Sequence, residues 1–496
     1  MLEEQYTYNA EQSENMIIRG DNLEALKALL PRYEGKVKCI YIDPPYNTGN
    51  EGWVYNDNVN DPRIKKWLGE VVGKEGEDLS RHDKWLCMMY PRLKLLHRLL
   101  AEEGVIFISI DDTEFSYLRL ICDEIFKNFA EAIVWQKRTS PDARKKLSSG
   151  HEYVLIYTKN PDQSLGLKLL PLEGKDAEAY TNPDSDPRGP WISSPFTAPG
   201  YRPNQMYPIT TPTGKTMMPP KGRCWCNIEE VYQRLLSEGR MWFGADGNGV
   251  PRRKTYLSER EGRGVWTWWT NSEVGYTQIA TQELAAILGK AVFDYPKPIR
   301  LISRIIQMAS SDGDIILDSF AGSGTTAHAV LNMNKADGGH RKFILVEMMD
   351  YAESITAERV KRVIDGYGEG KNAVAGTGGD FTFYDLGHVL LLPNGNLNED
   401  VGAEKIREYV YFMETKSSIE PDKTDEPYYM GVHLDSAYYF FYERDSLTTL
   451  SRDFLGNIKT KAGRYTIYAD QCTLSQSELE RWHITFKKIP RDISKL

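Results

Sequence analysis

Apolar and polar positions alternate along the first part of the chain in a way that predicts strands and helices in turn. Residues 37–42 form a short, almost wholly apolar run, as expected of a strand buried on both faces. Residues 22–33 instead carry apolar side chains at helical spacing. The same two patterns recur, predicting helices at 84–104 and 114–129 and strands at 16–21, 105–110, 131–137 and 152–159. Strands that alternate with helices indicate an α/β fold with a mostly parallel sheet covered on both faces.

The alternation stops between about 160 and 290 and returns at 293. The interrupted part is dense in Pro, Gly and Thr, so we predict an insertion of loops and short strands. Beyond it, a helix after Pro298 and two strand-to-helix units continue the first pattern. A Gly-rich linker follows residue 370, and the remainder is rich in strands. The expected segments are therefore 1–160, 161–290, 291–370 and a small α+β domain at 380–496.

Composition restricts the class of protein. With 496 residues, 41% hydrophobic and 26% charged, the chain is expected to be a soluble globular protein of two or three domains. Its first residues are polar and acidic, and no apolar run approaches the roughly 18 residues of a membrane span, so we expect a cytoplasmic location and no membrane association. The six cysteines are scattered. Cys224 and Cys226 lack the further ligands that a zinc ion needs, so no metal is expected.

The formal net charge of -9 argues at first sight against a nucleic-acid partner. Its distribution matters more than the total. Residues 135–146 hold five cations against one carboxylate, and residues 250–264 are also basic on balance. Taken alone, each run is better explained as a solvated surface loop, but both leave a basic surface available to an acidic partner.

Residues 318–325 form a glycine loop between an apolar strand and a helix. Gly322 and Gly324 would let the backbone pass close to a ligand, and Glu347 ends the next strand, where an acid suits a pair of ribose hydroxyls. The pattern indicates a cofactor that contains adenosine, without distinguishing NAD from S-adenosylmethionine. A tight turn with no ligand is the alternative. A P-loop is excluded here, because no Gly-Lys-Ser/Thr follows.

The strand at 37–42 ends in the tetrapeptide Asp43, Pro44, Pro45 and Tyr46, which a dehydrogenase does not need. An exocyclic amine of a nucleobase is a poor nucleophile, because its lone pair is delocalised into the ring. The Asp43 carboxylate and the Pro44 carbonyl would accept both N–H groups and stabilise the positive charge that develops during methyl transfer. The prolines stiffen the loop and remove donors. Tyr46 offers a flat face on which an extruded base can stack.

This interpretation also limits the chemistry. Transfer to an amine requires no covalent intermediate, so the absence of a Pro-Cys nucleophile is consistent with it, whereas methylation of a cytosine carbon would need that thiol. A carboxylate near its reference pKa of about 4 is a weak base, so hydrogen bonding and positioning are the expected role of Asp43. A proline turn with a satisfied aspartate is the alternative that involves no substrate.

The two motifs resemble those of the amino-group DNA methyltransferases of the β arrangement, in which the Asp-Pro-Pro-Tyr tetrapeptide precedes the cofactor loop Phe-Ala-Gly-Ser-Gly-Thr. The resemblance covers about residues 16–365. Six blocks look most like the modification (Mod) subunit of type III restriction-modification systems: YIDPPYNTGNEGWVYND, GVIFISIDD, HEYVLIYTKN, DYPKP, FAGSGTTAHAVLNMN and the following GGHRKFILVE. The resemblance implies a Rossmann-like class I methyltransferase fold with circularly permuted motifs, and S-adenosyl-L-methionine as the cofactor.

The same resemblance assigns roles to single residues. Asp43, Pro44, Pro45 and Tyr46 match the catalytic tetrapeptide. The expected cofactor-binding residues are Asp318, Phe320, Gly322, Gly324 and Thr325 in the loop, Glu347 at the ribose, Lys297 at the methionine end and Asp21 near the adenine.

The implied activity is methyl transfer to the N6 amine of an adenine extruded from double-stranded DNA. Residues 161–290 would recognise the target sequence, and residues 380–496 would serve assembly or partner docking. Members of the family act as homodimers, and a separate restriction subunit, a helicase-nuclease, supplies cleavage. The alternatives are a stand-alone or type II adenine methyltransferase, a cytosine-N4 methyltransferase, which usually carries Ser at the position of Asp43, a peptide glutamine methyltransferase, and a silent DNA-binding subunit.

Overall fold

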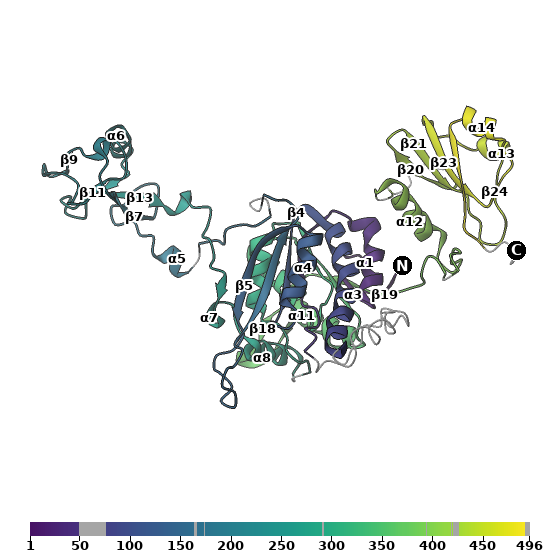
Figure 1. The fold of residues 1–496 in the computed structure, drawn as a ribbon, viewed down its shortest axis with the longest axis horizontal. Helices are drawn as coiled ribbons and strands as arrows, with labels where there is room; N and C mark the ends of the chain where they lie inside the picture. Colours follow the sequence, from purple (N-terminus) through teal and green to yellow (C-terminus); the bar gives the residue numbers. More distant parts are fainter. Residues whose placement is uncertain are drawn as a thin grey trace. The chain divides into compact units, whose positions relative to one another are not determined.

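The computed structural model describes residues 1–48, 76–162, 166–172, 174–289, 292–392, 394–417, 419 and 426–491, with backbone alone at 76–81 and 175. Residues 49–57 of the block YIDPPYNTGNEGWVYND lie outside these ranges. The chain divides into two compact units (Figure 1): unit 1 comprises Met1–Lys168 with Thr267–Leu496, and unit 2 comprises Leu169–Trp266.

A ten-stranded sheet forms the centre of unit 1. In spatial order its strands are β1 (Leu2–Tyr8), β19 (Phe381–Leu386), β2 (Met16–Arg19), β16 (Lys342–Glu347), β15 (Ile315–Asp318), β3 (Val37–Ile42), β4 (Leu100–Ile110), β6 (His151–Thr158), β5 (Asn128–Gln136) and β14 (Trp268–Trp269). The six strands from β19 to β4 are parallel, whereas β6 is antiparallel to both of its neighbours. The predicted α/β fold with a mostly parallel sheet is confirmed.

The order of the strands brings distant parts of the sequence together. β15 and β16, from the second half of the chain, lie between β2 and β3 from its beginning. Because these four strands are parallel, their carboxyl ends meet at one edge of the sheet. The antiparallel strand β6 begins at this edge. The glycine loop after β15 and the tetrapeptide after β3 therefore start from adjacent strands.

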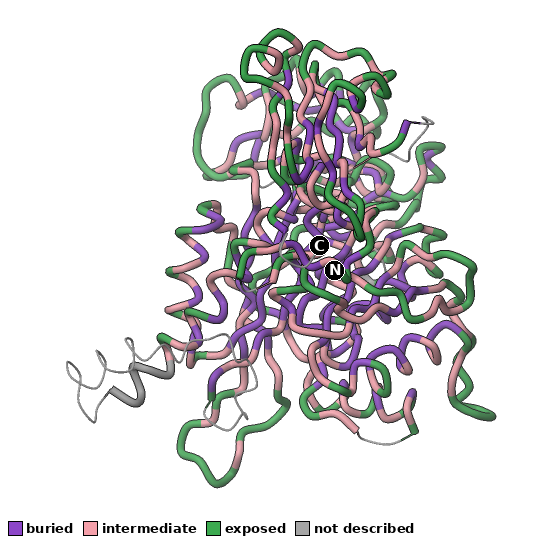
Figure 2. Tube along the Cα trace, turned by 90° about the vertical axis from the view of Figure 1, so that its right-hand side faces the viewer, coloured by how far each residue is buried: buried purple, intermediate pink, exposed green. Residues whose placement is uncertain are grey.

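Helices pack side by side in two groups. One group contains α1 (Asn22–Tyr33), α3 (Gly76–Leu99) and α4 (Phe115–Ile125). The other contains α8 (Thr277–Leu288), α9 (Ile299–Ala309), α10 (Thr325–Asp337) and α11 (Glu358–Asp365). The inner strands are almost completely buried, and Figure 2 shows buried positions in the interior and exposed ones in the outer loops. In the described part of the chain, no helix combines the length and apolarity that crossing a membrane requires.

The predicted C-terminal end of one helix is wrong. The helix expected over 84–104 stops at Leu99, and β4 begins with the next residue. Leu100 pairs with Val37 on β3, and the register then shifts before Val105 pairs with Cys39. The gain from pairing and burying Leu100 in the sheet outweighs the local helical pattern of residues 101–103.

Unit 2 has its own small core. Phe196, Tyr207, Trp225, Tyr232 and Phe243 pack together beside the helix α6 (Glu229–Ser237). Its three-stranded sheet consists of β12 (Met241–Trp242), β13 (Arg252–Tyr256) and β7 (Trp191–Pro195). Unit 2 also contains two-stranded sheets, formed by β11 (Arg223–Trp225) with β8 (Thr197–Pro199) and by β10 (Thr216–Met217) with β9 (Ile209–Thr210). These short strands agree with the predicted insertion of loops and short strands.

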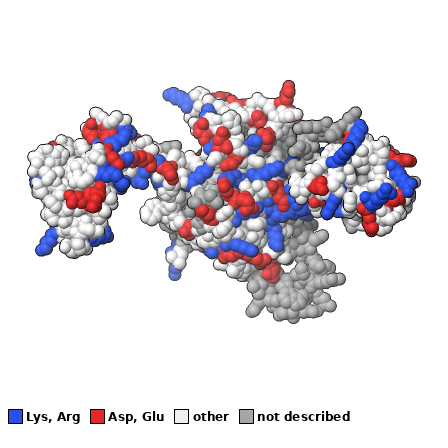
Figure 3. All heavy atoms as spheres, turned by 90° about the horizontal axis from the view of Figure 1, so that it is seen from above, with Lys and Arg blue, Asp and Glu red and all other residues white. Residues whose placement is uncertain are grey.

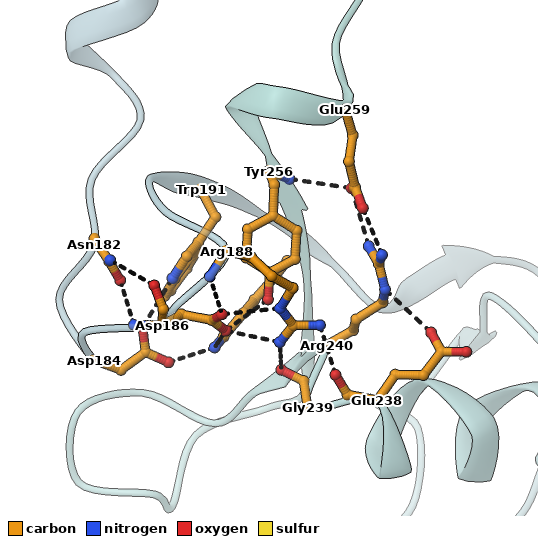
Figure 4. A network of polar contacts seen from close by, with 11 residues as sticks. Asn182, Asp184, Asp186, Arg188, Trp191, Glu238, Gly239, Arg240, Tyr256 and Glu259 are labelled. Carbon is orange, nitrogen blue, oxygen red and sulfur yellow. Dashed lines mark hydrogen bonds and ion pairs between the residues drawn. The ribbon is translucent and has the colours of Figure 1, made fainter.

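A buried polar network completes unit 2 (Figure 4). The Asp186 carboxylate accepts hydrogen bonds from Arg188 Nε at 2.9 Å, from Lys254 Nζ at 3.0 Å and from the Tyr256 hydroxyl at 2.7 Å. Hydrogen bonding to Arg188 is the largest of the effects that hold the pKa of Asp186 far below its ordinary value. The ionised carboxylate therefore ties the loop at 182–188 to β13 without help from a large apolar core.

The boundaries of the compact parts differ from the expected ones at 161–290 and 380–496. Residues after Thr267 return to the sheet, because β14 pairs with β5. β19 likewise belongs to the central sheet, between β1 and β2. A separate four-stranded sheet follows: β20 (Tyr429–His433), β21 (Ser436–Phe440), β23 (Arg464–Ala469) and β25 (Ile484–Lys488). The helix α12 (Ala403–Thr415) contacts α1 through Glu408, whose Oε1 lies 2.5 Å from Arg32 Nε.

Candidate active site

The tetrapeptide begins where β3 ends. Asp43 follows Ile42 directly, so it lies at the carboxyl edge of the sheet. The Pro45 carbonyl accepts a hydrogen bond of 2.7 Å from Trp85 Nε1 on α3. Asn47 then adopts a positive φ of 57°, a conformation that Asn tolerates better than most residues, and its Nδ2 donates to Glu114 Oε1 at 2.5 Å. Contacts from α3 and from Glu114, the residue that precedes α4, therefore fix the exit of the chain from the strand.

Tyr46 and Asp43 belong to one hydrogen-bonded cluster. The Tyr46 hydroxyl lies 2.9 Å from Asp43 Oδ1 and 3.1 Å from Glu152 Oε2. Glu152 is the second residue of β6 and is 9% exposed. Because β6 is antiparallel to β4, its first residues lie at the edge where β3 ends. The antiparallel strand thus supplies a carboxylate to the tetrapeptide.

Two lysines neutralise these two carboxylates. Lys297 Nζ lies 2.5 Å from Asp43 Oδ2 and 3.8 Å from Glu152 Oε2, and it also lies 5.2 Å from the centroid of the Tyr46 ring. Lys137, directly after β5, places its Nζ 2.9 Å from Glu152 Oε1. The cluster therefore contains two acids, two ammonium groups and one phenol.

Burial and neighbouring charge act in opposite directions on these groups. Burial raises the pKa of Asp43 above its ordinary value, although Lys297 opposes this shift. Burial also opposes ionisation of Glu152, but Lys297 and Lys137 outweigh it and hold the pKa of Glu152 below its ordinary value. For Lys297, burial lowers the pKa, yet Asp43 and Glu152 outweigh it and raise the pKa. Burial raises the pKa of Tyr46 far above 10, so its hydroxyl stays protonated and donates.

The glycine loop lies between β15 and α10. Gly322 and Gly324 have positive φ values of 51° and 79°, in the left-handed region that disfavours other residues. A Cβ on Gly322 would lie 3.1 Å from Cζ of Phe293, and one on Gly324 would lie 3.2 Å from the Thr356 carbonyl oxygen. Both positions therefore require glycine for the backbone conformation and for the space around it.

Asp318 holds the glycine loop in place. Its Oδ1 accepts from the Phe320 backbone at 3.1 Å, and its Oδ2 accepts from the Thr326 hydroxyl at 2.5 Å. Burial raises the pKa of Asp318 to about 7. Asp318 is 2% exposed and Phe320 is 8% exposed and packs in the core of unit 1. In this structure the Asp318 side chain supports the loop through hydrogen bonds, and the Phe320 side chain anchors it by packing in the core.

Glu347 ends β16 and faces the glycine loop. Its Oε2 accepts from the Gly322 backbone N–H at 2.8 Å, and its Oε1 accepts from the Met349 N–H at 3.0 Å. Burial raises the pKa of Glu347 above its ordinary value. Tyr351 and the Met348 backbone also donate to this carboxylate and lower its pKa. A carboxylate has about four acceptor positions, so a further hydroxyl donor would take the place of one of these.

A buried arginine that the sequence did not single out also supports the loop. Arg359, on α11, donates through Nη1 to the Ser323 hydroxyl at 2.9 Å and to Thr325 Oγ1 at 2.8 Å. Its Nη2 lies 3.3 Å from Nδ1 of His328, a residue whose pKa is lowered well below its ordinary value, chiefly by burial. His328 is therefore neutral and accepts. An arginine on the inner face of an amphipathic helix was the available signal in the sequence.

Asp21 acts as a helix cap in this structure. Its Oδ1 accepts from the backbone N–H groups of Leu23 at 2.8 Å and Glu24 at 3.3 Å. Its Oδ2 lies 3.1 Å from Nη2 of the buried Arg92. Asp21 follows β2 and so lies at the same edge of the sheet as Asp43 and Glu347. Its expected role near an adenine stays a prediction.

Lys297 joins the two motifs. Its ammonium contacts Asp43, while its backbone carbonyl accepts from Thr325 Oγ1 at 3.3 Å. The structure thus brings together Asp43, Tyr46 and Lys297 directly, and links them through Thr325 to the glycine loop. Glu152, Lys137 and Arg359 were missed. Glu152 and Lys137 escaped notice because strand polarity, on which their position depends, is not visible in the hydrophobic pattern.

Comparisons with known proteins agree with this geometry. The family model of DNA methylases, N6_N4_Mtase, matches residues 37–358, which include both the tetrapeptide and the glycine loop. The chain belongs to this DNA methylase family.

Three relatives illustrate the similarity. The Mod subunit of the type III restriction-modification enzyme StyLTI from Salmonella typhimurium is 38% identical over 67% of this chain and 52% of that protein. The EcoPI Mod subunit of Escherichia phage P1 is 32% identical over 70% of this chain and 60% of that protein. The type II methyltransferase M.KpnI of Klebsiella pneumoniae is 33% identical over 69% of this chain and 84% of that protein. The chain thus spans little more than half the length of the type III relatives.

Among solved structures, the cytosine-N4-specific PvuII DNA methyltransferase superposes with a TM-score of 0.36. The two sequences are 15% identical, and the match covers 72% of this chain and 90% of that one.

Proposed function

We propose that this chain is a site-specific DNA methyltransferase that transfers a methyl group from S-adenosyl-L-methionine to the N6 amine of an extruded adenine. The observation that carries the proposal is the contact of Asp43 with Tyr46 and Lys297 at the end of β3, beside the strand that bears the glycine loop. Membership of the DNA methylase family supports the same reaction. The permuted order of the motifs is supported by β15 and β16, which lie between strands from the start of the chain.

The residues of the tetrapeptide would hold the amine through hydrogen bonds. Asp43 is an acceptor, and Lys297 favours its ionised form against burial, which raises the pKa of Asp43. An amine N–H that approaches Asp43 would take the place of one of its present donors, Lys297 or Tyr46. Acceptors oriented in this way stabilise positive charge as it develops on the nitrogen, and they need no reorganisation during the reaction. The Tyr46 ring would stack on the base.

The glycine loop fits an adenosine-containing cofactor. Gly322 and Gly324 keep the loop free of side chains, and the Glu347 carboxylate would accept ribose hydroxyls in place of some of its present donors. When bound there, S-adenosylmethionine supplies the methyl group as an electrophile. Thr325 and Lys297 would lie at the boundary between cofactor and base, because they contact each other and Lys297 contacts Asp43. Asp318 and Arg359 would act by positioning the loop.

The remaining parts of the chain have proposed roles outside the chemistry. Unit 2, together with the residues that flank it in the segment 161–290, would recognise the target sequence in double-stranded DNA. The C-terminal segment 380–496 would serve assembly, as a homodimer or with a restriction subunit. The similarity to Mod subunits of type III restriction-modification enzymes supports a restriction subunit as the partner.

A type II or stand-alone adenine methyltransferase is the second candidate. M.KpnI favours it, because the match covers 84% of that protein, against 52% of the StyLTI Mod subunit. A restriction-subunit gene beside the gene for this chain would support the type III assignment, and its absence would favour the second candidate.

The decisive experiment is single-molecule sequencing of DNA from cells that express the chain, which reports the modified base and its sequence context together. We expect N6-methyladenine at one short sequence. Modified cytosine would contradict the adenine assignment, and unmodified DNA together with intact DNA binding would indicate a silent subunit.

The site is tested by matched substitutions. Asp43→Asn should abolish methyl transfer while leaving cofactor affinity within about twofold. Asp111→Asn is the control, since Asp111 follows the neighbouring strand β4 and accepts from the Thr113 N–H at 2.9 Å in its own turn. Full activity of Asp43→Asn would refute the catalytic assignment.

A further inference from the structure

The loop that joins β5 to β6 starts at the active-site cluster. The last pair of the two strands is Gln136 with His151, and the Lys137 N–H then donates to the Gly150 carbonyl at 2.9 Å. Residues 138–149, called the arm below, form the rest of this loop. Figure 1 shows the loop, in dark blue, projecting beyond the edge of the sheet. Lys137 at the base of the arm contacts Glu152, which in turn contacts Tyr46.

The base of the arm is fixed, and its tip is closed on itself. The Lys137 carbonyl accepts from the Thr277 N–H at 3.2 Å, and the Arg138 carbonyl accepts from Asn271 Nδ2 at 3.3 Å. Near the tip, the Ser148 hydroxyl accepts from the Asp142 N–H at 3.0 Å. These bonds hold the arm at a defined place beside the proposed base-binding site.

The arm is basic in a chain that is acidic overall. It carries four cations, Arg138, Arg144, Lys145 and Lys146, against the single carboxylate of Asp142. All four are exposed. On the face drawn in Figure 3, positive and negative side chains are instead interspersed. A local excess of exposed cations fits the phosphates of a nucleic acid.

Leu147 gives the arm a second property. It is 92% exposed and follows two lysines near the tip. A large apolar side chain that packs against nothing in the protein is costly in water. Proteins that distort DNA insert such side chains between base pairs, where they replace lost stacking. With about six residues on each side, the arm reaches at most about 20 Å, more than the roughly 8.5 Å depth of a major groove.

We propose that the arm enters double-stranded DNA beside the target base, with its cations on the phosphates and Leu147 in the space that the extruded base leaves. This inference rests on the proposed function, because it assumes a DNA substrate and base extrusion. It assigns to unit 1 a DNA contact that is separate from sequence recognition.

The phosphate contacts are tested by the salt dependence of binding to a duplex that contains the methylated sequence. The triple variant Arg138→Gln, Lys145→Gln, Lys146→Gln should lower the magnitude of the slope of log K against log salt by about 2.7, since each lost phosphate contact contributes about 0.9. The control removes three exposed cations elsewhere, Lys371, Arg481 and Lys488. An unchanged slope in the arm variant, or an equal change in the control, would overturn this part of the proposal.

The role of Leu147 is tested with Leu147→Ser, and Leu434→Ser is the matched control because Leu434 is 90% exposed. On a paired duplex, Leu147→Ser should lower kcat at least tenfold and reduce the fluorescence gain of 2-aminopurine at the target position. A duplex with no base opposite the target should restore its kcat to within about threefold of wild type, because extrusion then costs less.

Equal losses on both duplexes, or no loss on either, would overturn the inserted role of Leu147. If the unaltered chain methylates no DNA at all, the proposed function fails and this inference fails with it. If the unaltered chain methylates DNA and the arm variants behave like it, the proposal about the arm is overturned while the proposed function stands.

Discussion

The Glu152 carboxylate accepts a hydrogen bond from the Tyr46 hydroxyl at 3.1 Å, although the two residues are 106 positions apart in the sequence. Glu152 is the second residue of the antiparallel strand β6, whereas Tyr46 lies just beyond the end of the parallel strand β3, and the two meet at one edge of the sheet. The contact orients the Tyr46 ring, and Glu152 also shares Lys297 with Asp43. Glu152 is therefore a positioning residue of the proposed reaction.

Glu152→Ala should lower kcat by about 10- to 100-fold, the cost of losing a hydrogen bond to a charged group, and leave the KM for S-adenosylmethionine within about twofold. Glu152→Gln keeps an acceptor for Tyr46 and should lose less. Because Glu152 helps to raise the pKa of Asp43, both variants should also move the acidic limb of the pH profile of kcat to lower pH. The exposed Glu131→Gln on β5 is the control. A purely structural role would lower the melting temperature and leave the limb in place.

Lys297→Gln should move the acidic limb in the opposite direction. Burial raises the pKa of Asp43, and Lys297 opposes this shift. An opposite charge at this distance lowers a carboxyl pKa by about 1 to 3 units, so its loss should move the limb upward by a similar amount. Activity then falls earlier as the pH decreases, because protonated Asp43 offers one acceptor fewer. Steady-state kinetics from pH 5 to 9 measure the effect, with Lys27→Gln as a control on the exposed side of α1. A limb that stays in place would show that Lys297 does not tune Asp43.

Gly322→Val should weaken binding of S-adenosylmethionine tenfold or more, measured by calorimetry. The new Cβ would lie 3.1 Å from Phe293 in a backbone conformation with φ of 51°, and overpacking of this kind costs about 1 to 3 kcal/mol. Gly313→Val is the matched control: Gly313 also has a positive φ, of 78°, but nothing lies within 4 Å of its Cβ position. Both variants should lose stability, and the first alone should lose affinity. Equal affinities would place the cofactor elsewhere.

Asp318 should make the stability of the fold depend on pH. Burial raises its pKa from 3.8 to about 7, so the folded state binds its proton more tightly than the unfolded state does. Its contribution to stability is full below about pH 4 and is lost as the pH rises through 7. In Asp318→Asn, the melting temperature should fall less between pH 4 and pH 7 than it does in the unaltered chain. Identical pH dependence of the two proteins would show that Asp318 is ionised throughout.

Much of the fold follows from local patterns. The strand at 37–42, the helix at 22–33 and the strand before the glycine loop were all predicted, because a buried parallel strand is apolar throughout and an amphipathic helix repeats every 3.6 residues. The end of the helix at Leu99 was missed, since pairing of Leu100 with Val37 depends on a strand that lies far away in the sequence. The expected start of a separate domain at residue 380 preceded β19, which joins the central sheet by pairing with β1 and β2.

The sequence by itself determined which residues stand at the ends of the strands: Asp43 after β3, the glycines after β15 and Glu347 at the end of β16. These residue types indicate the chemistry, because a hydrogen-bond acceptor, a glycine without a side chain and a carboxylate can each be recognised in the sequence alone. Only the tertiary structure decided what those residues contact. The antiparallel direction of β6 brings Glu152 and Lys137 to the tetrapeptide. The segment that leads into α9 brings Lys297 to Asp43. Such contacts join residues that are 15 to 254 positions apart, and burial among them sets their pKa values, so no local pattern records them.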